Sequence, residues 1–133
     1  MTPPLAAVAL WAGLLALLYL ALALPVVVRR RRAQIGLGTG GDQVLLRAVR
    51  VHGNFAEYVP LALVLMILAA TARWGSLYMH ALGATLLVAR VLHAIGVWRH
   101  DGRSAGRFLG TLLTWIVTAI AALLCLVAAL GWR

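Results

Sequence analysis

The sequence predicts an all-α, transmembrane four-helix bundle of one domain, and composition and hydrophobic runs lead to that class. Of the 133 residues, 64% are hydrophobic and 11% are charged, whereas soluble domains have about 45–50% apolar and about 25% charged residues. Four charge-poor runs each exceed the roughly 18 residues that can span a bilayer as a helix. The expected spans cover about residues 4–28, 44–72, 76–98 and 108–132, which leaves no room for a soluble domain.

The first run is almost entirely Leu, Ala and Val, and Pro25 lies near its end, where a membrane helix tolerates a kink. The basic run Arg29–Arg32 and a glycine-rich connection follow, which predicts a flexible loop. A phosphate-binding loop would need a preceding strand, and here a membrane helix precedes it. Short connections join the remaining runs, so consecutive helices should be antiparallel neighbours. Close helix contacts are expected at the small residues Gly83, Ala84, Ala94, Gly96 and Gly110.

The basic residues are distributed unevenly along the chain. All twelve are arginines, and the net charge is +9. Nine flank the first and third connections, two lie near the second connection and the C-terminus, and Arg90 lies inside a span. This asymmetry indicates membrane topology rather than a nucleic-acid partner, and the positive-inside rule puts the Arg-rich loops in the cytoplasm and both termini outside. The single Cys125 permits no intrachain disulfide, and no metal site is expected.

Polar residues on the second run form one stripe, because a helix advances about 100° per residue. The stripe contains Arg47, Arg50, Asn54 and Glu57, with Tyr58 at its edge. It extends from the cytoplasmic end toward the middle of the membrane. Ionisable residues inside a membrane mark functional sites by default, so this face is predicted to meet a polar partner rather than lipid.

Two further spans carry polar residues in the same half of the membrane. The third has Arg90 and His93 one turn apart, at a depth close to that of Glu57. Glu57 and Arg90 are therefore expected to pair, either as a purely structural ion pair or as part of a ligand site. The surplus Arg50 indicates an anionic ligand or contact with lipid phosphate. On the fourth span one face carries Arg107, Thr111, Thr114 and Thr118.

Three segments, "LLRAVRVHGNFAEYVPLALVLM", "ARVLHAIG" and "GRFLGTLLTW", resemble the second, third and fourth helices of the MAPEG family, the membrane-associated proteins in eicosanoid and glutathione metabolism. The second-helix spacing Arg-x-x-x-Asn-x-x-Glu, followed by Pro, is met by Arg50, Asn54, Glu57 and Pro60. The resemblance covers all four spans and is strongest to short bacterial members. It implies a bacterial inner-membrane location and a homotrimer of twelve helices, with glutathione as co-substrate bound between protomers.

The resemblance also implies roles for individual residues. Arg107 would be catalytic by stabilising the glutathione thiolate. At Val97 and Thr111 the glutathione-using members carry tyrosines. This departure leaves two activities open, a general thiol transferase or a binding protein that catalyses no reaction. The residues expected to bind glutathione are Arg50, Asn54, Glu57, Arg90 and His93, and the secondary candidates are Arg47, Tyr58, Arg103 and Thr111.

Three functions are compatible with these features. The first is a glutathione transferase or peroxidase that takes hydrophobic small-molecule electrophiles from the bilayer, with the thiol pKa lowered by Arg107 near a helix N-terminus. The alternative is a non-catalytic scaffold of the same family that binds lipids or fatty acids. A small proton-coupled multidrug exporter is a second alternative, in which Glu57 would carry the proton.

The arginine asymmetry generates a topology prediction. The C-terminus should lie outside the cytoplasm, because nine arginines favour the cytoplasmic side and two the other. A phosphatase fused after Arg133 should therefore be active, and a fluorescent protein fused there should not fluoresce. Paired phosphatase and fluorescent-protein fusions would measure this. A cytoplasmic C-terminus would contradict the orientation and place the polar stripe in the opposite half of the membrane.

Overall fold

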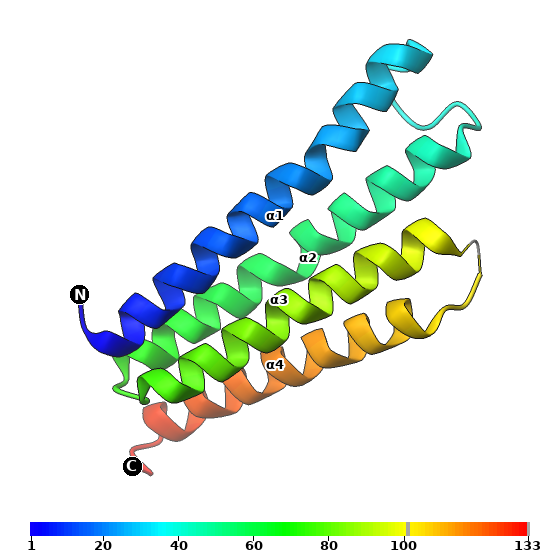
Figure 1. Ribbon diagram of the computed structural model, residues 1–133. Helices are drawn as coiled ribbons and strands as arrows, with labels where there is room; N and C mark the ends of the chain where they lie inside the picture. Colours follow the sequence, from blue (N-terminus) through cyan, green and yellow to red (C-terminus); the bar gives the residue numbers. More distant parts are fainter. Residues whose placement is uncertain (101, 133) are drawn as a thin grey trace.

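The computed structural model describes residues 1–100 and 102–132, and the described chain folds into four helices (Figure 1). They are α1 (Pro3–Ala33), α2 (Gln43–Thr71), α3 (Ser76–Arg99) and α4 (Ala105–Ala129). Each is long and apolar enough to cross a membrane, so the prediction of four spanning helices is confirmed. The first helix continues past the expected end at residue 28, and Arg30, Arg31 and Arg32 lie in its last turn.

The central pair of the bundle is α2 and α3. These two helices contact each other, and each also packs against both α1 and α4, whereas α1 and α4 do not meet within the part of the chain that the structure describes. The two Arg-rich connections lie at one end of the bundle, and both termini lie at the other with the α2–α3 turn (Figure 1). This arrangement agrees with the antiparallel order expected from the short connections.

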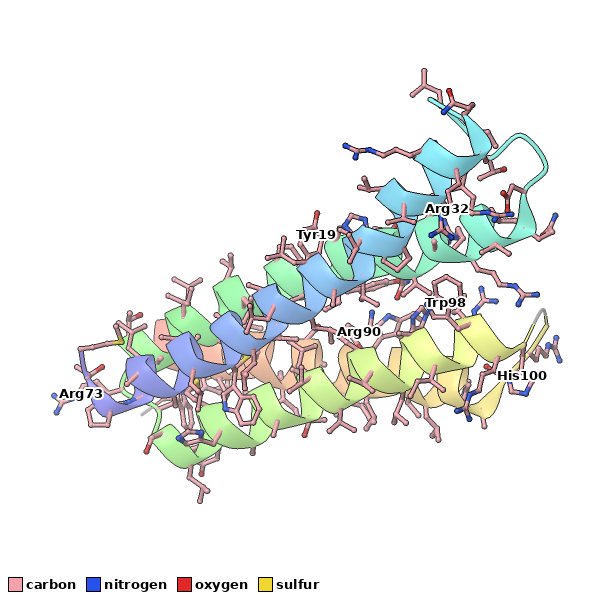
Figure 2. All side chains as sticks on the ribbon, turned by 45° about the horizontal axis from the view of Figure 1, so that its top comes forward. Tyr19, Arg32, Arg73, Arg90, Trp98 and His100 are labelled. Atoms are coloured by element: carbon pink, nitrogen blue, oxygen red, sulfur yellow. The ribbon has the colours of Figure 1, made fainter. Side chains whose placement is uncertain are left out.

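The two ends of the bundle are packed differently. The larger apolar cluster draws on all four helices and includes Leu15, Met66, Leu86 and Val117. The Arg-rich end holds only a small cluster around Val51, in which Ala94 and Val97 are the other buried members. At this end the α1–α2 pair diverges from the α3–α4 pair in both views (Figures 1 and 2). The bundle is therefore closed in one half and open where the arginines gather.

Glycines bring α3 close to its neighbours, as the sequence predicts. A Cβ atom added at Gly96 would lie 2.3 Å from the backbone nitrogen of Arg107, and one at Gly110 would lie 2.5 Å from the carbonyl oxygen of Ala89. Both distances are too short for any side chain, so α3 and α4 touch backbone to backbone here. This contact sets the position of the first turns of α4 against the last turns of α3.

Arginines tie the α1–α2 connection to the end of α1. Asp42 caps α2 by accepting from the backbone nitrogens of Val44 and Leu45, and Arg29 Nε donates to Asp42 Oδ2 at 2.7 Å. Arg30 donates to backbone carbonyls of the glycine-rich loop. The Leu45 N–H, followed by the Arg29 guanidinium, lowers the pKa of Asp42, so this carboxylate stays ionised and is committed to the cap and to Arg29.

Candidate functional site

A cleft of about 160 Å³ opens at the Arg-rich end between α2, α3 and the start of α4. It occupies the half of the bundle where apolar packing is sparse. Its charged lining consists of arginines from two helices. The full lining is Gln43, Leu46, Arg47, Arg50, Asn54, His93, Val97, His100 and Arg107.

The structure brings five of the predicted site residues together at this cleft. Arg47, Arg50 and Asn54 come from the stripe on α2, His93 comes from α3, and Arg107 comes from α4. The helical spacing on α2 predicted the first three as neighbours. Their roles in ligand binding stay predictions.

Four lining residues were not among the predicted site residues. Gln43 lies four residues before Arg47 and continues the same stripe, so its spacing could have identified it. His100 follows the last turn of α3, and only the tertiary contact of α3 with α2 and α4 places it at the cleft. Leu46 and Val97 complete the lining and carry no polar signal in the sequence.

The expected ion pair between Glu57 and Arg90 is not formed within the protomer, so that expectation is wrong. Arg90 Nη1 donates to Asn54 Oδ1 at 2.8 Å, and Arg90 Nη2 donates to the Gly110 carbonyl oxygen at 3.1 Å. Glu57 lies on the exposed face of α2. Because Glu57 follows Asn54 by three residues, it is rotated by about 60° around the helix, which turns it away from α3. Tyr58 is half-buried beside it.

Arg90 lies behind the wall of the cleft rather than on its lining. Its side chain is 2% exposed, and Figure 2 shows it between the α1–α2 pair and α3. No lining residue of the cleft is acidic. Asp42, the described carboxylate nearest in sequence, is held by Arg29. The cleft is therefore cationic, a property that favours an anionic ligand.

A second, more open hollow of about 810 Å³ adjoins the cleft and shares Arg107 with it. Its lining comes from the start of α4 and the residues before it, and includes Arg103, Phe108 and Thr111. Arg103 and Thr111 are two of the predicted secondary candidates, so the structure places them next to the cleft but not in it. The Thr111 hydroxyl donates to the Arg107 carbonyl at 2.9 Å.

Arg107 lies at the N-terminal turn of α4. Its backbone nitrogen donates to the capping Ser104 Oγ at 3.2 Å, and Ser104 Oγ also donates to the Gly96 carbonyl at 3.1 Å. The cap thus fixes this turn against α3. Both the guanidinium and the free N–H groups of a helix N-terminus favour a nearby anion.

Metal ions require particular ligand groups, which His, Cys, Asp and Glu side chains supply. Across residues 1–100 and 102–132, no three His, Cys, Asp or Glu side chains are grouped so that they could hold a metal ion. The cleft instead offers guanidinium and amide groups, which bind carboxylate or phosphate oxygens.

Four helices that can span a membrane, with an arginine-lined cleft in one half of the bundle, define an integral multi-pass membrane protein of the helical type. Residues 8–127 match the MAPEG family, and the chain belongs to that family. The inner membrane protein YecN of Escherichia coli strain K12 is 37% identical over 103 residues, which cover 73% of this chain and 79% of YecN. YecN of E. coli O6:H1 strain CFT073 gives the same values.

The cleft generates a prediction for ligand affinity. Arg50→Ala should weaken binding of glutathione, which carries two carboxylates, by about 10–100-fold, because a hydrogen bond to a charged group contributes about 1.5–3 kcal/mol. Titration calorimetry on the detergent-purified protein would measure it. Arg73→Ala removes the same charge at the opposite end of the bundle (Figure 2) and serves as the matched control. Equal affinities for the two variants would remove Arg50 from the site.

Proposed function

We propose that the protein is a glutathione-dependent transferase or peroxidase that acts on apolar electrophiles drawn from the bilayer. One observation carries the proposal: Arg107 lies on both the cationic cleft and the more open hollow. A conjugating enzyme needs its thiolate and its electrophile in contact with each other, next to a group that stabilises the thiolate. Arg107 occupies such a position, at a helix N-terminus.

The cleft would hold the tripeptide by its carboxylates. Arg47 and Arg50 lie one turn apart on α2 and supply guanidinium groups that match carboxylate geometry. Arg47 also donates to the Trp98 carbonyl at 3.2 Å, which holds its side chain across the mouth of the cleft. The glutathione thiol would then lie toward Arg107. A positive charge and a helix N-terminus both lower a thiol pKa from about 8.5, so the reactive thiolate would be populated near neutral pH.

The hollow supplies the place for the electrophile. Phe108 and Ala105 are exposed at the start of α4 and form part of its lining, so an apolar molecule would meet apolar surface there. The threonine hydroxyls of α4 are bonded to carbonyls of their own helix. These hydroxyls therefore need no hydrogen bond from a ligand. The fourth helix can face an apolar molecule without leaving them unpaired.

We also propose that the functional unit is a homotrimer whose sites lie in the cytoplasmic half of a bacterial inner membrane. Two observations support a partner copy. The cleft of about 160 Å³ is smaller than the roughly 300–1,000 Å³ of ordinary ligand pockets. Glu57 is exposed on a spanning helix, where an ionised side chain costs about 2.5–3.5 kcal/mol at the membrane centre. A neighbouring protomer would cover Glu57 and enlarge the site, and Glu57 would then take the glutamyl amine.

The assembly gives a separate prediction. Native mass measurement in mild detergent should show three chains. Glu57→Leu should leave the trimer intact while weakening glutathione binding, because Leu fills the interface but cannot accept a hydrogen bond from the glutamyl amine. A wild-type monomer that binds glutathione with the same affinity as the assembled protein would contradict the trimer. The mass and the affinity are measured on the same sample.

A non-catalytic lipid-binding scaffold is the second candidate, and an apolar groove favours it. The groove, of about 270 Å³, lies between α1 and α2 and includes Tyr19, Phe55 and Pro60. Its walls would accept an acyl chain. Membership of the MAPEG family favours both of these functions over a multidrug exporter.

The enzyme proposal is tested by separating turnover from affinity. Arg107→Ala should lower the conjugation rate with a generic aryl halide by about 10–100-fold while changing glutathione affinity much less, because the guanidinium lowers the thiol pKa, whereas the carboxylates are held by Arg47 and Arg50. Arg103→Ala, in the same hollow but outside the cleft, is the matched control. Glutathione binding by the wild-type protein without turnover would favour the scaffold, and no binding would remove the enzyme.

A further inference from the structure

Arg90 is a buried cation with only neutral partners. It is 2% exposed, its Nη1 and Nη2 atoms donate to the Asn54 amide oxygen and the Gly110 carbonyl, and its Nε has no partner. No carboxylate among residues 1–100 and 102–132 pairs with it. A buried charge without a counter-ion is costly, and a neutral side chain could fill the same space. The two acceptors, the Asn54 amide and the Gly110 carbonyl, indicate the role of the buried guanidinium.

The contact with Arg90 determines which way the Asn54 amide faces. A guanidinium has five donors and no acceptor, so the Asn54 atom that meets Arg90 Nη1 must be the oxygen. The amide nitrogen is the group that remains. Asn54 also lines the cleft, so its N–H donors are the part of the amide that Arg90 leaves without a partner of this kind. Without Arg90, either orientation of the amide would be open.

The same guanidinium holds the turn of α4 that follows Arg107. The Gly110 carbonyl accepts from Arg90 Nη2 and, at 2.7 Å, from the Thr114 hydroxyl. Gly110 lies three residues after Arg107, and its missing side chain lets α3 approach. One buried side chain on α3 therefore fixes both the Asn54 amide on α2 and the first turns of α4.

We propose that Arg90 is a positioning residue that makes Asn54 a hydrogen-bond donor toward the cleft. It does not touch the ligand; it turns the Asn54 amide so that its NH₂ group joins the guanidinium groups of Arg50 and Arg107 as donors. At the Asn54 position a ligand acceptor, a carboxylate or peptide carbonyl oxygen, is therefore favoured over an ammonium or N–H group. This specifies the ligand chemistry of the proposed glutathione site and rests on that proposal.

A single NMR signal can report the orientation, because Asn54 is the only asparagine in the chain. Selective ¹⁵N labelling of asparagine gives one side-chain amide pair in the assembled protein. Adding glutathione should shift these NH₂ signals, as expected when their protons bond to the ligand. The same shift should occur in Arg90→Lys, because an ammonium is also a donor without an acceptor. Bound ligand with unmoved Asn54 signals would overturn the proposal.

A double-mutant cycle separates positioning from simple charge attraction. Arg90→Gln and Asn54→Ala should each weaken glutathione binding by about tenfold, and the double variant by about tenfold rather than a hundredfold, because the two side chains act as one unit. Arg90→Lys should stay within about threefold of the wild type, since it keeps the donor-only contact. Additive losses, or an Arg90→Gln variant that binds normally, would overturn the proposal. If Arg90→Gln does not assemble, the NMR result and Arg90→Lys decide.

Failure of the proposed function gives a different pattern. If the wild-type protein binds no glutathione, inorganic phosphate, whose unprotonated oxygens accept hydrogen bonds, is used as the probe with the same variants and the same Asn54 signals. Phosphate binding that shifts these signals would support Asn54 as a donor toward the cleft and remove glutathione as its ligand. Binding of neither probe would overturn both proposals.

Discussion

The open half of this bundle depends on the buried guanidinium of Arg90. It joins α2, α3 and α4 through the Asn54 amide and the Gly110 carbonyl, at a level where the apolar cluster is small. Leucine and valine side chains could hold the helices together with no polar cost, as they do in the other half. A directional donor can do what apolar packing cannot, because it specifies which atom of its neighbour faces it.

The two halves of the molecule are thus held together by different interactions. From the termini to the middle, buried apolar side chains of all four helices pack together, and glycines such as Gly83, packed against Trp11, permit close approach. Toward the Arg-rich end the helix pairs separate, and the space between them is lined by polar groups. The closed half holds the four helices together, and the open half contains the cleft.

Arg107 connects the two environments that such a protein must bring together. It lies at the start of α4, where the cap by Ser104 and the backbone contact at Gly96 fix its position. On one side is the cationic cleft, and on the other is the open hollow with Phe108. The arginines on α2 line one wall of the cleft while Arg107 faces both spaces, so under the proposed function substitutions on the two helices should have separable effects on affinity and on turnover.

The sequence by itself determined the membrane class, the four helices and the polar stripe on α2, because hydropathy and helical periodicity are local properties. It also predicted Arg47, Arg50, Asn54, His93 and Arg107 as site candidates, and the structure gathers them at one cleft. Only the tertiary structure decided that Arg90 meets Asn54 instead of Glu57, and that His100 joins the cleft. Periodicity gives the angle between residues on one helix, but the rotation of that helix against its neighbours is set by packing. Here the contact of α3 with α4 at Gly96 and Gly110 fixes where Arg90 points, and a helix rotated by about 60° would have presented Glu57 in place of Asn54.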